Sequence, residues 1–149
     1  MKTKATILCI LAFTVFTLII SCNETSLNDS GTQQISYISH KSNGCVSENS
    51  LLKTEDDAVL NVEYDNGNLN VEAMFTSLCA LTFKDSVLFS GNRIEIFLNA
   101  EGEGAYCLCP YKEEFNFKVS DASKLCIFFN YKLKDQTDYY ILADTTIVL

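Results

Sequence analysis

The chain has one histidine, one proline, six glycines and no tryptophan among its 149 residues. A single His excludes any site built from several imidazoles, so catalysis that needs histidine depends on His40 alone. The low proline and glycine content excludes collagen-like and low-complexity chains. Basic residues are also scarce, because 11 Lys and Arg stand against 19 Asp and Glu, for a net charge of −8. Such an acidic chain cannot neutralise a row of phosphates, so we expect no nucleic-acid partner.

An uncharged apolar run occupies residues 5–20, directly after Lys2 and Lys4. As a helix this run would be about 24 Å long, which is shorter than the roughly 30 Å hydrocarbon core of a bilayer. A basic start followed by a short apolar run is typical of a secretory signal rather than of a membrane span. Residues 1–21 are therefore predicted to be a signal peptide.

The end of this run has a more specific pattern. Residues 18–22 read Leu-Ile-Ile-Ser-Cys, which resembles the lipobox of bacterial lipoproteins. The resemblance implies that the signal is cut before Cys22, and that Cys22 carries the acyl chains that hold the protein on a membrane. Asn23 in the next position resembles signals sorted to the outer membrane, on its periplasmic face or at the cell surface. Residues 22–34 are almost entirely polar, so they are predicted to form a flexible lipidated tether.

Residues 35–149 are predicted to form one β domain, because apolar and polar residues alternate along most of this region. The predicted strands are 35–39, 58–64, 69–75, 86–89, 93–98, 107–119, 125–133 and 139–149. The pair Asn66-Gly67 predicts a tight hairpin, and Ser90-Gly91-Asn92 predicts a second one. About eight strands separated by turns indicate an antiparallel β-sandwich of the immunoglobulin-like kind. A small closed β-barrel is the alternative.

The strand over 107–119 has the clearest alternation. Its inward positions are predicted to be Cys107, Cys109, Tyr111, Phe115, Phe117 and Val119. Glu113 interrupts this set, and we expect it at the margin of the sheet, with a buried acid of raised pKa as the alternative. Pro110 predicts a bend, a bulge or an edge position. Cys126 falls in the polar register of its strand. The aromatic residues in the nominally outer register are Phe97, Phe128 and Tyr140, which would stack on sugars or be covered by another sheet or partner.

Five cysteines remain after the predicted signal and the lipidated residue: Cys45, Cys79, Cys107, Cys109 and Cys126. Disulfides are expected in an exported chain. Two bridges and one free thiol can be arranged in fifteen ways, and we expect Cys79 to pair with Cys107 or Cys109. Zinc held by Cys79, Cys107 and Cys109, with or without Cys45, is the alternative. The Cys-Leu-Cys spacing is tighter than structural zinc sites favour, so no metal and no cofactor are expected.

Catalytic motifs are scarce. His40 stands five residues before Cys45, and a His paired with a Cys or a carboxylate is a conceivable catalytic pair. A histidine at the end of a strand is the simpler interpretation. The acidic clusters at 55–57 and 101–103 lack the spaced ligands of an EF-hand loop, so they are not expected to bind calcium.

Several short motifs resemble a group of small Bacteroidota lipoproteins of unknown function. They are residues 40–45, Asn68-Leu69, Leu78-Cys79-Ala80, residues 91–96 and the Cys-Leu-Cys-Pro-Tyr run at 107–111. The resemblance implies a β-sandwich lipoprotein and supplies no activity. The predicted function is therefore that of a membrane-anchored, non-catalytic envelope module that binds an envelope protein or a glycan. The alternative is an extracytoplasmic hydrolase or thiol enzyme that uses His40 with a Cys or a carboxylate.

Overall fold

The computed structural model describes residues 34–46, 58–120 and 122–149. The predicted signal peptide, Cys22 and the acidic cluster at 55–57 lie outside the described residues. The predicted tether also lies outside them except for Gln34, which is the first residue of a strand. No helix in the described ranges has the length and apolar character needed to cross a bilayer.

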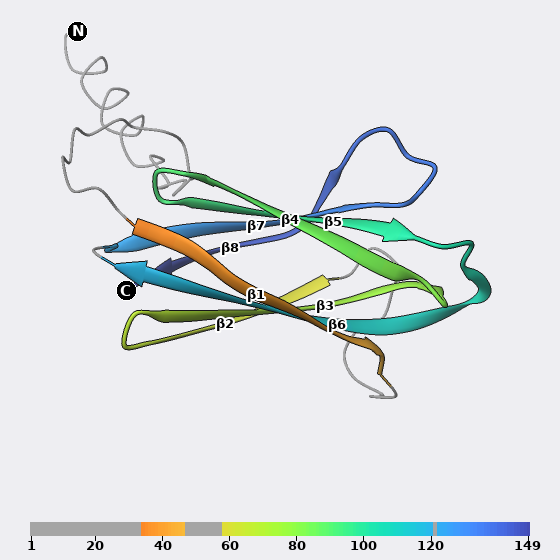
Figure 1. Cartoon of the computed structure of the whole chain (residues 1–149), viewed down its shortest axis with the longest axis horizontal. Coiled ribbons are helices and arrows are strands. Elements are labelled where there is room, and N and C mark those ends of the chain that lie inside the picture. The colour runs from red at the N-terminus through yellow and green to blue at the C-terminus, as the bar shows by residue number, and fades with distance from the viewer. Residues whose placement is uncertain (1–33, 47–57, 121) are drawn as a thin grey trace, which may run out of the picture.

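Eight strands form two four-stranded sheets that pack face to face (Figure 1). Sheet A has the order β1-β6-β3-β2, with β1 at Gln34–Cys45, β6 at Ala105–Ser120, β3 at Asn68–Cys79 and β2 at Ala58–Asp65. Sheet B has the order β4-β5-β7-β8, with β4 at Thr82–Ser90, β5 at Arg93–Glu101, β7 at Lys124–Lys132 and β8 at Tyr140–Val148. These open sheets confirm the predicted β-sandwich, and the described residues do not close into a barrel.

Both predicted hairpins are present. In the β2–β3 turn, Asn66 and Gly67 have positive φ angles of 49° and 78°, which is the conformation that a two-residue hairpin requires. A Cβ at Gly67 would lie 3.1 Å from the carbonyl oxygen of Val119, so a side chain there would be crowded as well as strained. Gly91 supplies the positive φ of the β4–β5 turn.

One strand pairing differs from the antiparallel prediction, because β5 and β7 run parallel. The chain leaves sheet B after β5, forms β6 in sheet A and returns to sheet B as β7 (Figure 1). Because of this crossover through sheet A, β7 runs in the same direction as β5. The other pairings that join the described strands are antiparallel.

The core lies between the inner faces of the two sheets, as the period-two pattern predicts. The largest fully buried apolar side chains are Leu69, Val71, Phe75, Ile94, Ile96, Leu98, Phe115, Phe117, Leu125, Ile127 and Phe129. Burial of each large apolar side chain contributes about 1.5–3 kcal/mol. The ring of Phe75 contacts four others, those of Phe83, Tyr111, Phe129 and Tyr131.

Two face predictions are wrong, and a third residue is more buried than its register suggests. Cys107 is exposed rather than inward, because a register shift after Leu78 pairs Cys79 with Ala105 and breaks the alternation of β6. Cys126 keeps the predicted outer register of β7 but is only 2% exposed, since it lies between Arg93 of β5 and Thr146 of β8.

The second wrong face prediction is the placement of Tyr140 in the outer register with Phe97 and Phe128. Tyr140 is the Cα partner of Tyr131 and its ring packs edge-on against that buried ring, so it lies on the inner side of sheet B. The irregularity between Phe129 and Asn130 shifts the alternation of β8 and produces this reversal. Phe97 and Phe128 remain in the outer register, and each is partly covered, Phe97 by Tyr139 and Phe128 by the guanidinium of Arg93.

Candidate functional site

The single histidine bridges the two sheets. Strand β1 is an edge of sheet A and β4 is an edge of sheet B, and the two edges contact each other. His40 on β1 stacks on Phe115 of β6, with ring centroids 4.6 Å apart and planes 4° from parallel. Its Nε2 atom lies 2.5 Å from Oε2 of Glu113, and its Nδ1 atom lies 3.0 Å from Oδ1 of Asp85. One imidazole therefore connects a carboxylate of sheet A to a carboxylate of sheet B.

Glu113 is fully buried, with 0% of the residue exposed. The prediction that it lies at the sheet margin is wrong, because it faces inward from β6, a central strand of sheet A. The carboxylate can be accommodated because each oxygen has a hydrogen-bonding neighbour: His40 lies at Oε2, and Ser42 Oγ donates to Oε1 at 2.7 Å. A buried charge without such neighbours would be strongly unfavourable.

Asp85 has a second neighbour besides His40. The hydroxyl of Tyr37 donates to Oδ2 of Asp85 at 2.5 Å. Burial raises the pKa of Tyr37 above its usual range, and the hydrogen bond and negative charge of Asp85 raise it further. Tyr37 therefore stays a neutral donor at physiological pH. We call His40, Glu113, Asp85, Tyr37 and Ser42 the His40 clasp.

The protonation of His40 follows from opposing effects. Burial acts to lower the pKa of His40, but hydrogen bonding to Glu113, the charges of Glu113 and Asp85, and the hydrogen bond to Asp85 together raise it above its ordinary value. The imidazolium is also the form that can donate to both carboxylates at once. The clasp therefore favours a positively charged ring between two negatively charged groups.

This arrangement does not resemble a poised nucleophile and base. Both ring nitrogens of His40 face carboxylates, so neither is available to accept a proton from a substrate. The hydroxyl of Ser42 donates to Glu113 rather than to the imidazole. The side chain of His40 is 11% exposed and that of Glu113 is 0% exposed, so the contact between them is enclosed. The geometry is that of an ion bridge between the sheets, which is buried at Glu113 and partly exposed at Asp85.

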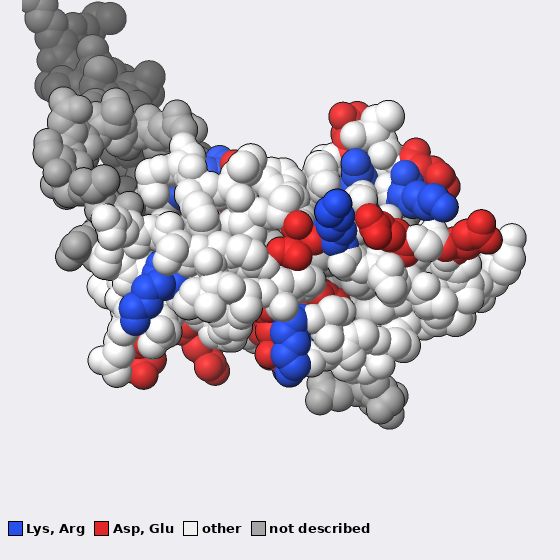
Figure 2. All heavy atoms as spheres, in the orientation of Figure 1, with Lys and Arg blue, Asp and Glu red and all other residues white. Residues whose placement is uncertain are grey.

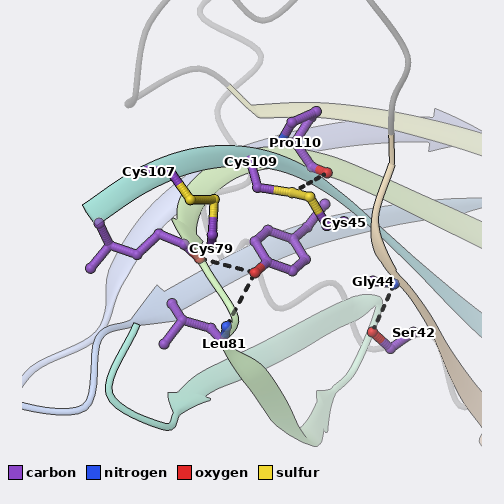
Figure 3. The surroundings of a disulfide bond; sticks show 10 residues. Ser42, Gly44, Cys45, Cys79, Leu81, Cys107, Cys109 and Pro110 are labelled. Atoms are coloured by element: carbon purple, nitrogen blue, oxygen red, sulfur yellow. Dashed lines mark hydrogen bonds between the residues drawn. A yellow bond between two sulfur atoms is a disulfide. The ribbon is translucent and has the colours of Figure 1, made fainter. Parts of the chain in front are cut away.

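Four cysteines of the described residues form two disulfides at one end of sheet A (Figure 3). Cys45 of β1 is bonded to Cys109 of β6, with Cα atoms 5.7 Å apart. Cys79 of β3 is bonded to Cys107 of β6, with Cα atoms 5.4 Å apart, which confirms that Cys79 pairs with one cysteine of the Cys-Leu-Cys run. The two bridges indicate an oxidising, extracytoplasmic location.

The zinc alternative used the same four sulfur atoms. Sulfurs that are bonded in pairs cannot also serve as zinc-binding thiolates. Elsewhere among the described residues, no group of three or more His, Cys, Asp or Glu side chains is placed to hold a metal ion.

A second feature, which the sequence analysis did not identify, lies on the outer face of sheet A. Two adjacent hollows of about 370 and 420 Å³ open there, and both are lined by Glu63 and Asn70. We define the polar groove by six residues of these hollows: Ser39, Asn61, Glu63, Asn70, Glu72 and Asn116. The signal in the sequence was the run of polar residues at alternate positions of β2, β3 and β6, which is also the ordinary pattern of a solvated sheet face.

Hydrogen bonds and an ion pair fix the orientation of the side chains in the polar groove. Asn70 Nδ2 donates to Asn116 Oδ1 at 3.0 Å, and Asn116 Nδ2 donates to Ser39 Oγ at 3.3 Å. Glu72 lies 2.5 Å from Lys112 Nζ and accepts from Asn61 Nδ2 at 3.2 Å. The bond to Lys112 is the main cause that holds the pKa of Glu72 below its ordinary value, against a smaller opposing effect of burial.

The His40 clasp and the polar groove thus differ in what they offer to other molecules. The clasp is buried at the His40–Glu113 contact, reaches solvent at Asp85 and Tyr37, and has hydrogen-bonding atoms that face one another, whereas the polar groove is open to solvent on the outside of sheet A. Comparison with models of known protein families, with characterised proteins and with solved structures found no match for this chain.

Proposed function

We propose that this protein is a membrane-anchored, non-catalytic lipoprotein of the cell envelope whose β-sandwich acts as a binding module. The observation that carries the proposal is the state of His40, whose two nitrogens both face carboxylates, one from each sheet. The catalytic alternative based on His40 would need that imidazole as its base, with a nucleophile or a water beside it. In the described residues the clasp instead links the two sheets.

The lipid anchor is carried by Cys22. The basic start, the apolar run at 5–20 and the Ser21-Cys22 junction support cleavage and acylation at this position. The chain is acidic, so an anionic membrane surface would repel it, and the acyl chains must then supply the attachment. The two disulfides are consistent with a module held in the envelope of a bacterium, at its outer membrane.

Binding rather than chemistry is supported by where the ordered polar side chains are exposed. The polar groove presents amides and carboxylates that the core does not use. Acidic and basic side chains are interspersed on the face of the molecule in Figure 2, without a broad basic patch that would favour nucleic acid. The partner is therefore an envelope component, either a glycan or a protein.

The second candidate is a hydrolase that uses His40 with Glu113. The 2.5 Å contact between these side chains favours it, because a carboxylate and the imidazole that it orients are two of the three members of a catalytic triad. This function would require the clasp to open and release one ring nitrogen. In that case His40→Gln would abolish hydrolysis without removing the protein from the membrane.

The anchor is tested on full-length protein extracted from envelope membranes. Mass spectrometry should find the mature N-terminus at Cys22 with acyl chains attached. Cys22→Ala should release the protein from the membrane fraction or stop its processing, whereas Cys9→Ala, the matched change inside the predicted signal, should do neither. A mature N-terminus elsewhere, or an unmodified Cys22 in membrane-bound protein, would refute the anchor.

A further inference from the structure

We propose that the polar groove on sheet A binds an uncharged glycan chain. This inference rests on the proposed function and gives its ligand a chemical class. It follows from the shape of the polar groove, from the hydrogen-bonding groups that line it and from its charge.

The polar groove runs across the strands rather than along them. Ser39, Asn116 and Asn70 are successive Cα partners across β1, β6 and β3, and Glu63 of β2 is the partner of Asn70. Four strands at a spacing of about 4.8 Å give a row roughly 14 Å long. The two hollows of about 370 and 420 Å³ meet at Asn70 and Glu63 in this row. An extended ligand of several small units fits this shape better than a single compact molecule.

The side chains of Ser39, Asn116 and Asn70 hold one another in fixed orientations through hydrogen bonds. The Asn70 side chain donates to Asn116, and the Asn116 side chain donates to Ser39. The hydroxyl hydrogen of Ser39 and the side-chain oxygen Oδ1 of Asn70 can therefore form hydrogen bonds with a ligand. Glu63 adds two acceptor oxygens at the other end of the row. Planar amides and carboxylates offer paired hydrogen-bonding atoms at fixed spacing, which suits the neighbouring hydroxyls of a sugar. The order of the row also lowers the entropy lost on binding.

The charge of the polar groove selects against anionic ligands. Glu63 forms no ion pair with a lysine or arginine of the described residues, and Asp65 lines the same hollow. The Lys112 ammonium is paired with Glu72, and the Lys118 ammonium donates to the neutral amide of Asn68 and keeps its charge. Three carboxylates, those of Glu63, Asp65 and Glu72, therefore stand against two ammonium groups. Acidic sugars would therefore meet unpaired carboxylates, whereas hydroxyl groups can donate to them.

The composition of the polar groove also favours a glycan over a protein partner. Protein interfaces depend on buried aromatic or arginine anchors, and the lining of the two hollows exposes none. Its exposed apolar residue is Ile38, which the β-bulge between Tyr37 and Ser39 leaves 57% exposed at the rim. One aliphatic side chain beside many polar groups suits a sugar ring, with its small C–H face and its many hydroxyls.

The test uses the full-length protein, extracted in a detergent without a sugar headgroup and shown by mass spectrometry to carry its acyl chains. Binding is measured by calorimetry against uncharged oligosaccharides of three to six units, built from glucose, mannose, galactose and N-acetylglucosamine, and against oligogalacturonate as the acidic probe. We expect at least one uncharged series to bind and to gain affinity with length, and oligogalacturonate not to bind. Asn70→Ala combined with Asn116→Ala should weaken binding at least about tenfold, because two positioned amides are removed.

Asn99→Ala is the matched control, because it removes the same side chain from β5 in sheet B and should leave affinity unchanged. The inference is overturned if no uncharged series binds at millimolar concentration, if the double variant binds as well as the parent, or if oligogalacturonate binds equally. Each of these results leaves acylation at Cys22 intact, so it refutes the glycan without refuting the anchor. If mass spectrometry instead finds membrane-extracted protein without acyl chains at Cys22, and this protein still binds the oligosaccharide, the anchor alone is refuted.

Discussion

Replacing His40 with phenylalanine should be among the most destabilising single changes in this protein. The new ring can still stack on Phe115, so the substitution preserves the packing and removes only the two nitrogens. Glu113, which is 0% exposed, would keep only Ser42 as a donor. Removing one partner of a buried ion pair costs about 3–5 kcal/mol, because the other charge is left uncompensated.

A second variant, at Glu113, removes the buried negative charge while it keeps the size of the side chain. Glu113→Gln keeps the volume and an acceptor for Ser42, but it removes the buried negative charge, so it should cost less, about 1.5–3 kcal/mol. With the charge already absent, His40→Phe should do less additional harm. The double variant should therefore be more stable than the sum of the two single effects predicts, by about 1 kcal/mol or more.

The assay is urea unfolding followed by far-ultraviolet circular dichroism and tyrosine fluorescence, since the chain has no tryptophan. Lys41→Ala is a suitable control, because Lys41 is adjacent to His40 on β1 but its side chain is 65% exposed, and it should change stability by no more than about 0.5 kcal/mol. A cost below about 1 kcal/mol for His40→Phe, or strict additivity with Glu113→Gln, would show that the His40 clasp does not join the two sheets energetically.

Two further predictions concern pH and the disulfides. Because the pKa of His40 is raised in the folded state, the stability that its charge contributes is fully present below the unfolded value near 6.5 and is lost as pH rises through the folded value. The stability difference between the parent and His40→Phe should therefore be largest at mildly acidic pH and should shrink toward alkaline pH, and a difference that grows with pH would contradict this. Replacing both Cys45 and Cys109 with serine should lower the urea midpoint more than replacing both Cys79 and Cys107, because the first bridge spans 64 residues and the second spans 28. In the chain-entropy model these loops are worth about 4.3 and 3.6 kcal/mol, and Cys109 is also buried whereas Cys107 is exposed, so equal midpoints would count against this reasoning.

Much of the β-sandwich could be predicted from local patterns. Alternation along Leu69, Val71 and Phe75 placed one face of β3 in the core, and all three side chains are buried. The Asn66-Gly67 pair specified the β2–β3 hairpin, because few other residues adopt positive φ at both turn positions. These features depend on residues that are close in the chain, so they can be inferred without the rest of the fold.

The individual exceptions could not be predicted in this way. Cys107 turned outward because of a register shift against β3, and that shift depends on a strand some thirty residues earlier. Cys126 belongs to the polar register of β7, but the strands on both sides of it cover it. In both cases, alternation gives the relative sides of neighbouring residues, while the pairing of distant strands determines whether a side is open to solvent.

The sequence by itself determined the composition of the candidate site but not its assembly. It contained one histidine and an interrupting Glu113 in an otherwise apolar register, and each had a simpler separate interpretation. Only the tertiary structure brought them together, since His40 lies 45 residues from Asp85 and 73 from Glu113. The contact exists because β1 pairs with β6 while β4, in the opposite sheet, packs against β1. Strand pairing and sheet packing over such separations depend on the whole core, so no local pattern in the chain could specify this contact.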